Sequence, residues 1–216
     1  MTASASVEDY TKAVYVLESR HGVASTTALA ERLGVSAPAV SAMVKKLASL
    51  GYVSHVRYHG VRLTDEGRRV ALEVLRHHRL LETFLVEELG LSWDRVDAEA
   101  EVLEHVLSEG LEARIAAKLG DPTHDPHGDP IPALDGTVVE LPTATLESLP
   151  AGSHGTFVRV SDSDPALLRE LAGLGVRPGD VVEVVKTRPA TRIRSRAKTH
   201  TLRAELARAM RVEVEV

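Results

Sequence analysis

Four potential metal ligands stand close together in the middle of the chain. They are Asp97, Glu101, Glu104 and His105, spaced four, three and one residues apart. On a helix this spacing places all four on one face, where side chains three or four positions apart lie about 5–6 Å apart and can converge on one ion. His78 and Glu82 form a second pair at i, i+4. Two ordinary surface ion pairs are the alternative that spacing alone leaves open.

A second group of residues has the composition of a DNA-reading helix, which presents short polar and basic side chains from its N-terminal half. Serine, lysine and arginine side chains mostly hold phosphates. Because no outward Arg, Asn or Gln is present to grip a base, specificity would come from contacts to thymine methyl groups and from DNA shape. A helical trio that merely packs or binds protein is the alternative. The expected contacts are Thr26, Ser36, Ala37, Pro38, Ala39, Ser41, Ala42, Lys45 and Lys46, with Arg57 and Arg62 in the hairpin that follows.

The elements that must position these side chains begin with three short helices. Apolar spacing predicts helices at about 6–20 and 27–33, the second capped by Thr26 and closed by a glycine at position 34. Ser36 then caps a third helix that ends near position 51. Residues 52–64 alternate as a β-hairpin with a His-Gly turn. Helix, glycine turn, capped helix and hairpin together predict a winged helix-turn-helix.

The middle and the end of the chain have different patterns. We predict a long helix at 65–89, a helix from Ser92 to about 107, a helix to about 119 and a Pro- and Gly-rich linker to 136. Short strands and small helices follow, for which a small, mostly β barrel is the natural closure. The fold class is therefore mainly α with small β parts. Its expected domains are a DNA-binding domain (1–64), a helical metal-binding and dimerisation domain with linker (65–140) and a β domain (141–216).

Composition and charge narrow the function classes. The chain of 216 residues has no cysteine, which excludes zinc fingers, cysteine nucleophiles and iron–sulfur clusters. Residues 1–64 hold seven Lys/Arg against four Asp/Glu (net +3), residues 65–140 seven against eighteen (net −11), and residues 141–216 twelve against nine (net +3). No apolar run approaches the roughly 20 residues that span a bilayer, so we expect a cytoplasmic protein with no membrane contact.

Several short phrases also carry a family resemblance. They are Glu8-Asp9-Tyr10, the run from Ser36 to Ser41, His78-Arg79-Leu80, Glu104-His105, and Gly128-Asp129-Pro130-Ile131-Pro132. In this order they resemble the diphtheria-toxin-repressor family of metal-dependent regulators. The C-terminal part is similar to that family's SH3-like domain, which is related to a small domain of ferrous-iron transport proteins.

The resemblance implies two metal sites. A primary site would be carried by Asp9, Glu101, Glu104 and His105, and an ancillary site by His78, Glu82, Asp97 and Asp164. The family's iron branch has Met and Cys at the positions of Asp9 and Glu101, and hard carboxylates in place of two sulfurs favour Mn(II) over Fe(II). The manganese branch usually has an acid at the position of Lys12, and a lysine there opposes a second cation close to the first.

The resulting hypothesis is a homodimeric repressor, not an enzyme, that becomes competent for a palindromic operator when it binds Mn(II) or Fe(II). One alternative is a metal-dependent hydrolase, and another is a winged-helix regulator that responds to an organic ligand. Four other histidines, His55 and His59 in the hairpin and His124 and His127 in the linker, are expected to be solvent-exposed loop residues.

Overall fold

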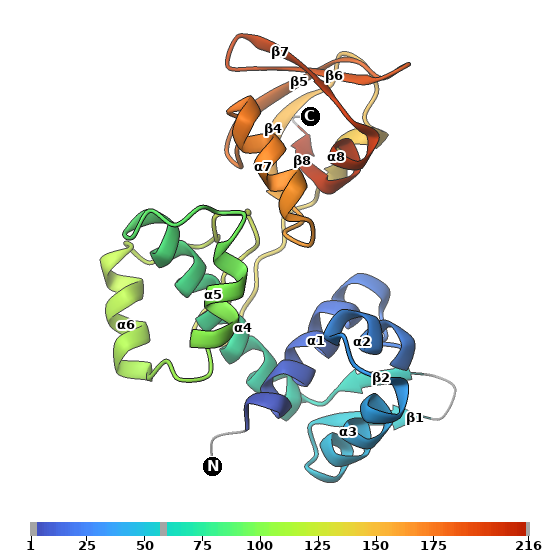
Figure 1. Cartoon of the computed structure of the whole chain (residues 1–216), viewed down its shortest axis with the longest axis vertical. Helices are drawn as coiled ribbons and strands as arrows, with labels where there is room; N and C mark the ends of the chain where they lie inside the picture. Colours follow the sequence, from blue (N-terminus) through green and yellow to red (C-terminus); the bar gives the residue numbers. More distant parts are fainter. Residues whose placement is uncertain (1–3, 57–59, 215–216) are drawn as a thin grey trace. The chain divides into compact units, whose positions relative to one another are not determined.

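The computed structural model describes residues 4–56 and 60–214 (Figure 1). These residues divide into two compact units. The first unit comprises residues 1–78, 104–107 and 132–137, and the second comprises 79–103, 108–131 and 138–216. The long helix α4 (Asp65–Glu87) passes from the first unit into the second after His78. Within the described ranges no helix is long and apolar enough to cross a membrane. The division into domains 1–64, 65–140 and 141–216 stays a prediction.

The first unit begins with the predicted three helices, α1 (Ala5–His21), α2 (Thr26–Leu33) and α3 (Ala37–Ser49). The Ser36 hydroxyl caps α3 by accepting a hydrogen bond from the amide of Ala39 at 3.4 Å. The predicted cap of α2 is wrong by one residue, because the hydroxyl of Ser25, not of Thr26, accepts from the amide of Ala28 at 3.0 Å. Fully buried side chains unite the helices with the hairpin: Val14, Leu29, Val40, Leu47 and Val61.

The hairpin is formed by β1 (Val53–Val56) and β2 (Gly60–Leu63), paired antiparallel. Arg57 and His59 lie outside the described residues. After the hairpin, the Thr64 hydroxyl donates to the carbonyl of Gly51 at 2.6 Å and accepts from the amide of Gly67 at 3.1 Å, which anchors the start of α4. The winged helix-turn-helix expected from the sequence is thus present.

The second unit contains the remainder of α4, α5 (Val96–Leu103) and α6 (Glu109–Lys118). The prediction of a helix from Ser92 to 107 is wrong at both ends. The Ser92 hydroxyl bonds to the carboxylate of Asp94 and caps nothing, and α5 ends at Leu103. Glu104 and His105 therefore lie in a turn after the helix and do not share a helical face with Asp97 and Glu101.

The C-terminal part of the second unit is one antiparallel sheet with strand order β3-β8-β4-β5-β6-β7. Its core contains the fully buried Phe157, Leu171, Ile193, Leu206 and Met210. No pairing of β3 with β7 closes the sheet among the residues that the structure describes. The elements are β3 (Ala144–Thr145), η1 (Leu146–Ser148), β4 (His154–Val160), α7 (Pro165–Leu174), β5 (Val181–Lys186), β6 (Thr191–Ser195), β7 (Lys198–Leu202), α8 (Ala204–Ala209) and β8 (Met210–Val214).

Candidate metal centres and DNA-binding surface

Glu104 is the central residue of a first candidate metal centre in the first unit. Its carboxylate is fully buried, and Oε1 accepts a hydrogen bond from Nζ of Lys12 on α1 at 2.5 Å. Oε2 lies 2.5 Å from Nδ1 of His78 on α4. Burial raises the pKa of Glu104, but the hydrogen bond from His78 and the positive charge of Lys12 outweigh burial and hold the pKa below its usual value. Glu104 is therefore a buried anion held at both oxygens.

His105 connects this anion to the beginning of α1. Its Nε2 lies 2.9 Å from Oδ1 of Asp9 and 3.7 Å from Oε1 of Glu104. One ligand atom each from Asp9, Glu104 and His105 lie within 4.8 Å of one another. Two carboxylates and an imidazole are donors that suit divalent first-row metals, so these three residues fit a cation.

Glu8 is a contributor that the sequence interpretation missed. Its Oε2 lies 2.6 Å from Nδ1 of His105, on the ring edge opposite Asp9. Metal-binding histidines commonly use their other ring nitrogen to bond a carboxylate, which fixes the ring's tautomer and orientation. The adjacent acids Glu8 and Asp9 were the feature of the sequence that could have predicted this contact. Consecutive residues near the start of a helix can approach one imidazole from two sides.

Three other predicted ligands lie on α5 and at the start of α7. Asp97 and Glu101 are exposed and lie four residues apart on α5 in the second unit. Their participation in a metal centre stays a prediction. Asp164 is the N-cap of α7, and its Oδ1 accepts from the amide of Ala166 at 2.8 Å.

A second candidate centre lies wholly within the second unit. It consists of Glu82 on α4, His127 in the linker and Asp162 after β4, whose ligand atoms lie within 4.8 Å of one another. The sequence interpretation identified Glu82 but missed the other two. The prediction that His127 is a solvent-exposed loop residue is wrong, since only 1% of it is exposed. The prediction for His124 is confirmed.

The chemistry of His127 favours a cation at this second centre. Its Nε2 lies 2.7 Å from the carbonyl oxygen of Trp93, and its ring stacks on the Trp93 ring at 5.7 Å. A carbonyl only accepts, so Nε2 donates to it, and the other ring nitrogen, Nδ1, lies 3.6 Å from Oε1 of Glu82. Burial and the charges of Asp129 and Glu82 raise the pKa of Asp162. A divalent ion would satisfy this cluster of acceptors.

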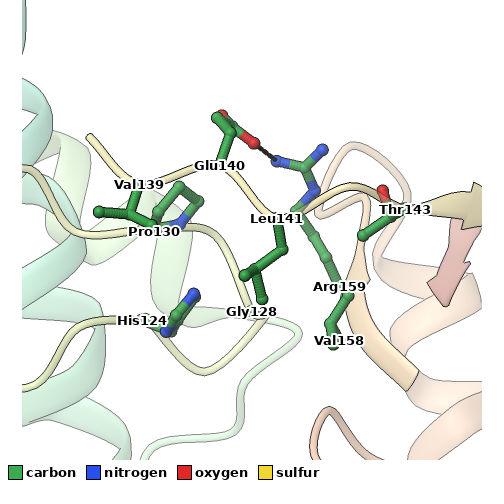
Figure 2. Close-up of a pocket in the computed structure, with 9 residues that line it drawn as sticks. All are labelled: His124, Gly128, Pro130, Val139, Glu140, Leu141, Thr143, Val158 and Arg159. Carbon is green, nitrogen blue, oxygen red and sulfur yellow. Dashed lines mark hydrogen bonds and ion pairs between the residues drawn. The ribbon is translucent and has the colours of Figure 1, made fainter. Parts of the chain in front are cut away.

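Asp125 stabilises a turn in the linker through hydrogen bonds to backbone amides. The buried Oδ1 of Asp125 accepts from the amides of His127 at 2.8 Å and Asp129 at 3.0 Å, which turns the segment inward. A small pocket separates the linker from β4, and Figure 2 shows Arg159 on its wall beside Glu140. Arg159 lies 3.3 Å from the Glu140 carboxylate and 3.4 Å from that of Asp129. The pocket's cation is thus neutralised by the linker itself.

The predicted DNA-binding residues form an exposed face of α3. Val40, Val44 and Leu47 are buried on the opposite face. Thr26 is partly buried, Arg62 is exposed on β2, and Arg57 is outside the described part of the chain. The exposed residues are Ser36, Ala37, Pro38, Ala39, Ser41, Ala42, Lys45 and Lys46.

Comparison with known proteins agrees with a DNA-binding domain and a metal-binding domain in this chain. Family models match for the iron dependent repressor N-terminal DNA binding domain (residues 2–61), the iron dependent repressor metal binding and dimerisation domain (64–133) and the FeoA domain (144–214). The iron-dependent repressor IdeR of Mycobacterium leprae is 36% identical over 222 residues, covering 95% of this chain and 96% of that protein. The diphtheria toxin repressor of Corynebacterium efficiens is 31% identical, covering 95% and 94%.

A solved structure of a manganese-dependent transcriptional repressor in complex with manganese is 43% identical, with a TM-score of 0.88 and coverage of 97% of this chain and 100% of that chain. The fold and the candidate centres therefore define a metal-dependent transcriptional repressor with an N-terminal DNA-binding domain and an SH3-like C-terminal domain. The chain belongs to the iron-dependent repressor family, which includes the diphtheria toxin repressor. The resemblance seen in the sequence is confirmed.

Proposed function

We propose that this repressor is a cytoplasmic protein that is activated by Mn(II) in preference to Fe(II). In its activated form it binds a palindromic operator as a homodimer and controls metal-homeostasis genes. The observation that supports manganese is the donor set of the first centre. Asp9, Glu104 and His105 offer carboxylate oxygens and an imidazole, and the chain has no cysteine to offer a thiolate. Hard oxygen donors suit Mn(II), whereas sulfur ligands favour softer metals.

Activation would act through the position of α1. Asp9 lies on α1, whose buried residues Tyr10 and Val14 belong to the core of the helix-turn-helix. Glu104 and His105 come from the turn after α5. A cation held by both segments would favour the arrangement in which they are close, and the coupling equals the difference in metal affinity between this arrangement and an open one.

The second centre would stabilise a different part of the molecule. Glu82, His127 and Asp162 come from α4, the linker and the segment after β4. A cation bound by all three would hold these segments of the second unit together. We therefore propose it as an ancillary site in which Asp162 takes the part that the sequence assigned to Asp164.

The test is DNA binding measured by fluorescence anisotropy with chelator-treated protein, then with Mn(II), Fe(II) under anaerobic conditions, or Zn(II). Couplings of about 1–3 kcal/mol correspond to a 5–150-fold gain in affinity. Asp9→Asn keeps the side-chain shape and should shift activation to higher Mn(II) concentration, whereas Glu31→Gln, at an exposed position of α2, should not. Equal DNA affinity of the natural chain with and without metal would refute the proposal.

The sequence leaves two other functions open, a metal-dependent hydrolase and a regulator of winged-helix type that responds to an organic ligand. No observation on the residues described favours either one. The pocket of Figure 2 is small, and its cation is already paired with acids of the linker.

A further inference from the structure

The C-terminal sheet carries a strongly basic segment that metal sensing does not use. Residues 186–203 contain seven Lys/Arg and no Asp/Glu. Three of the seven have acidic partners: Arg194 pairs with Glu183, Arg196 with Asp180 at 2.7 Å, and Arg203 with Glu170 at 2.6 Å. The other four are exposed, and no ion pair is recorded for them within the described part of the chain. These are Lys186, Arg188, Arg192 and Lys198.

The sheet register places three of these four cations close together. Lys186 on β5 is directly opposite Arg192 on β6, and Arg188 lies in the connection between the two strands. Like charges directly opposite on neighbouring strands destabilise a sheet. Arg192 is exposed between the buried Thr191 and Ile193. This end of the sheet is therefore a positive surface whose repulsion is not offset by acids of the same strands.

The surface has the composition of a phosphate-binding surface. Thr201 on β7 is directly opposite Arg192 and is also exposed, and Lys, Arg and Thr are among the side chains that commonly contact DNA phosphates. None of the large exposed hydrophobic side chains belongs to residues 186–203 among those described. The apolar centre that a typical protein interface buries is missing from this segment.

We propose that this end of the C-terminal sheet, formed by Lys186, Arg188 and Arg192, binds the phosphate backbone of double-stranded DNA. The contact is independent of base sequence and adds to that of the winged helix-turn-helix. It rests on DNA binding by the family, which the comparisons show, and does not depend on which metal activates the repressor. The competing occupant is the acidic segment 65–140 of this chain or of a second copy, with its net charge of −11.

The experiment measures the salt dependence of binding to a mixed-sequence DNA duplex by full-length, Mn(II)-loaded protein. Each phosphate contact contributes about 0.9 to the slope of log K against log salt. Lys186→Gln/Arg192→Gln should lower the slope by about 1.8 per protomer, so that raising salt from 50 to 200 mM weakens the variant roughly 12-fold less than the natural chain. The matched control is Arg203→Gln/Arg208→Gln, which removes the same net charge by replacing two cations that have acidic partners. The slope of this control should differ from that of the natural chain by less than about 0.45, half the contribution of one phosphate contact.

Melting of the DNA-free proteins accompanies the binding curves. An unchanged slope in the Lys186→Gln/Arg192→Gln variant overturns the proposal. A change in melting temperature at low salt with no change in slope also overturns it, and assigns the surface to the chain's own acidic segment. Should the double variant not fold, Arg188→Gln replaces it, with an expected change in slope of about 0.9, because Arg188 lies outside the strands. The Mn(II) concentration for half-activation at operator DNA should not change, which separates this proposal from metal sensing.

Discussion

Replacing Lys12 by methionine would remove a buried positive charge from the first metal centre and keep most of the side-chain volume. The Lys12 ammonium is 2.5 Å from Oε1 of Glu104, and the Glu104 carboxylate is fully buried. Removing one partner of a buried ion pair typically costs about 3–5 kcal/mol. Because His78 still contacts Oε2, we expect about 3 kcal/mol. At about 2–4 °C per kcal/mol for a chain of this size, the metal-free variant should melt roughly 6–12 °C lower.

The same change should strengthen metal binding. Two unit charges 4 Å apart interact by about 1 kcal/mol in water and about 4 kcal/mol at the effective dielectric constant of a protein surface, and a divalent ion doubles these values. A cation beside Glu104 is opposed by Lys12 to this extent. Lys12→Met should therefore bind Mn(II) at least tenfold more tightly, and saturating Mn(II) should recover part of the lost stability.

Thermal unfolding followed by circular dichroism, in chelator and in Mn(II), measures the first effect, and the electron paramagnetic resonance of free Mn(II) measures the second. Lys12→Arg keeps the charge and should change both quantities less. Lys118→Met, which removes an exposed cation 3.0 Å from Glu88, controls for net charge. If Lys12→Met melts at the natural temperature without metal and binds Mn(II) no more tightly, the electrostatic role assigned to Lys12 is incorrect.

Three further predictions concern the second unit. Gly128→Ala should destabilise the chain by well over 1 kcal/mol in urea titrations, because φ is +89° and a Cβ would lie 1.8 Å from a carbonyl oxygen of β4. The fluorescence of Trp93, the single tryptophan, should be quenched when Mn(II) occupies the second centre, and His127→Gln should abolish the quenching; unaltered quenching in that variant would contradict the assignment. Asp162→Asn should reduce the number of bound ions measured by equilibrium dialysis, whereas Asp164→Asn should leave this number unchanged and weaken only the cap of α7.

The N-terminal fold was predictable from sequence because local chemistry determines it. Ser36 caps α3, and a glycine with φ of +64° ends α2, so both boundaries are encoded within a few residues. The end of α5 was not predictable in this way. Glu104 leaves the helix, and its carboxylate bonds to Lys12, 92 residues away in sequence. The local helical pattern around Glu104 contains no information about a partner so distant in the sequence.

The candidate centres were likewise predictable only in part. Two carboxylates and a histidine of the first centre were identified from spacing and resemblance, since Asp9, Glu104 and His105 belong to recognisable phrases. His127 was misread because Pro- and Gly-rich composition indicates an exposed linker. Its burial depends on the Asp125 turn and on stacking against Trp93, and neither can be inferred from the composition of the segment.

The donor atoms of the two centres also determine how the sensor behaves towards oxidants. Every described ligand candidate is an aspartate, a glutamate or a histidine, and the chain has no cysteine. Peroxide converts thiolate ligands into sulfenic and higher acids, so that a thiolate-based sensor loses its metal when the cell is oxidised. The carboxylate and imidazole donors of the candidate centres contain no sulfur, so this route to loss of the metal is closed to them.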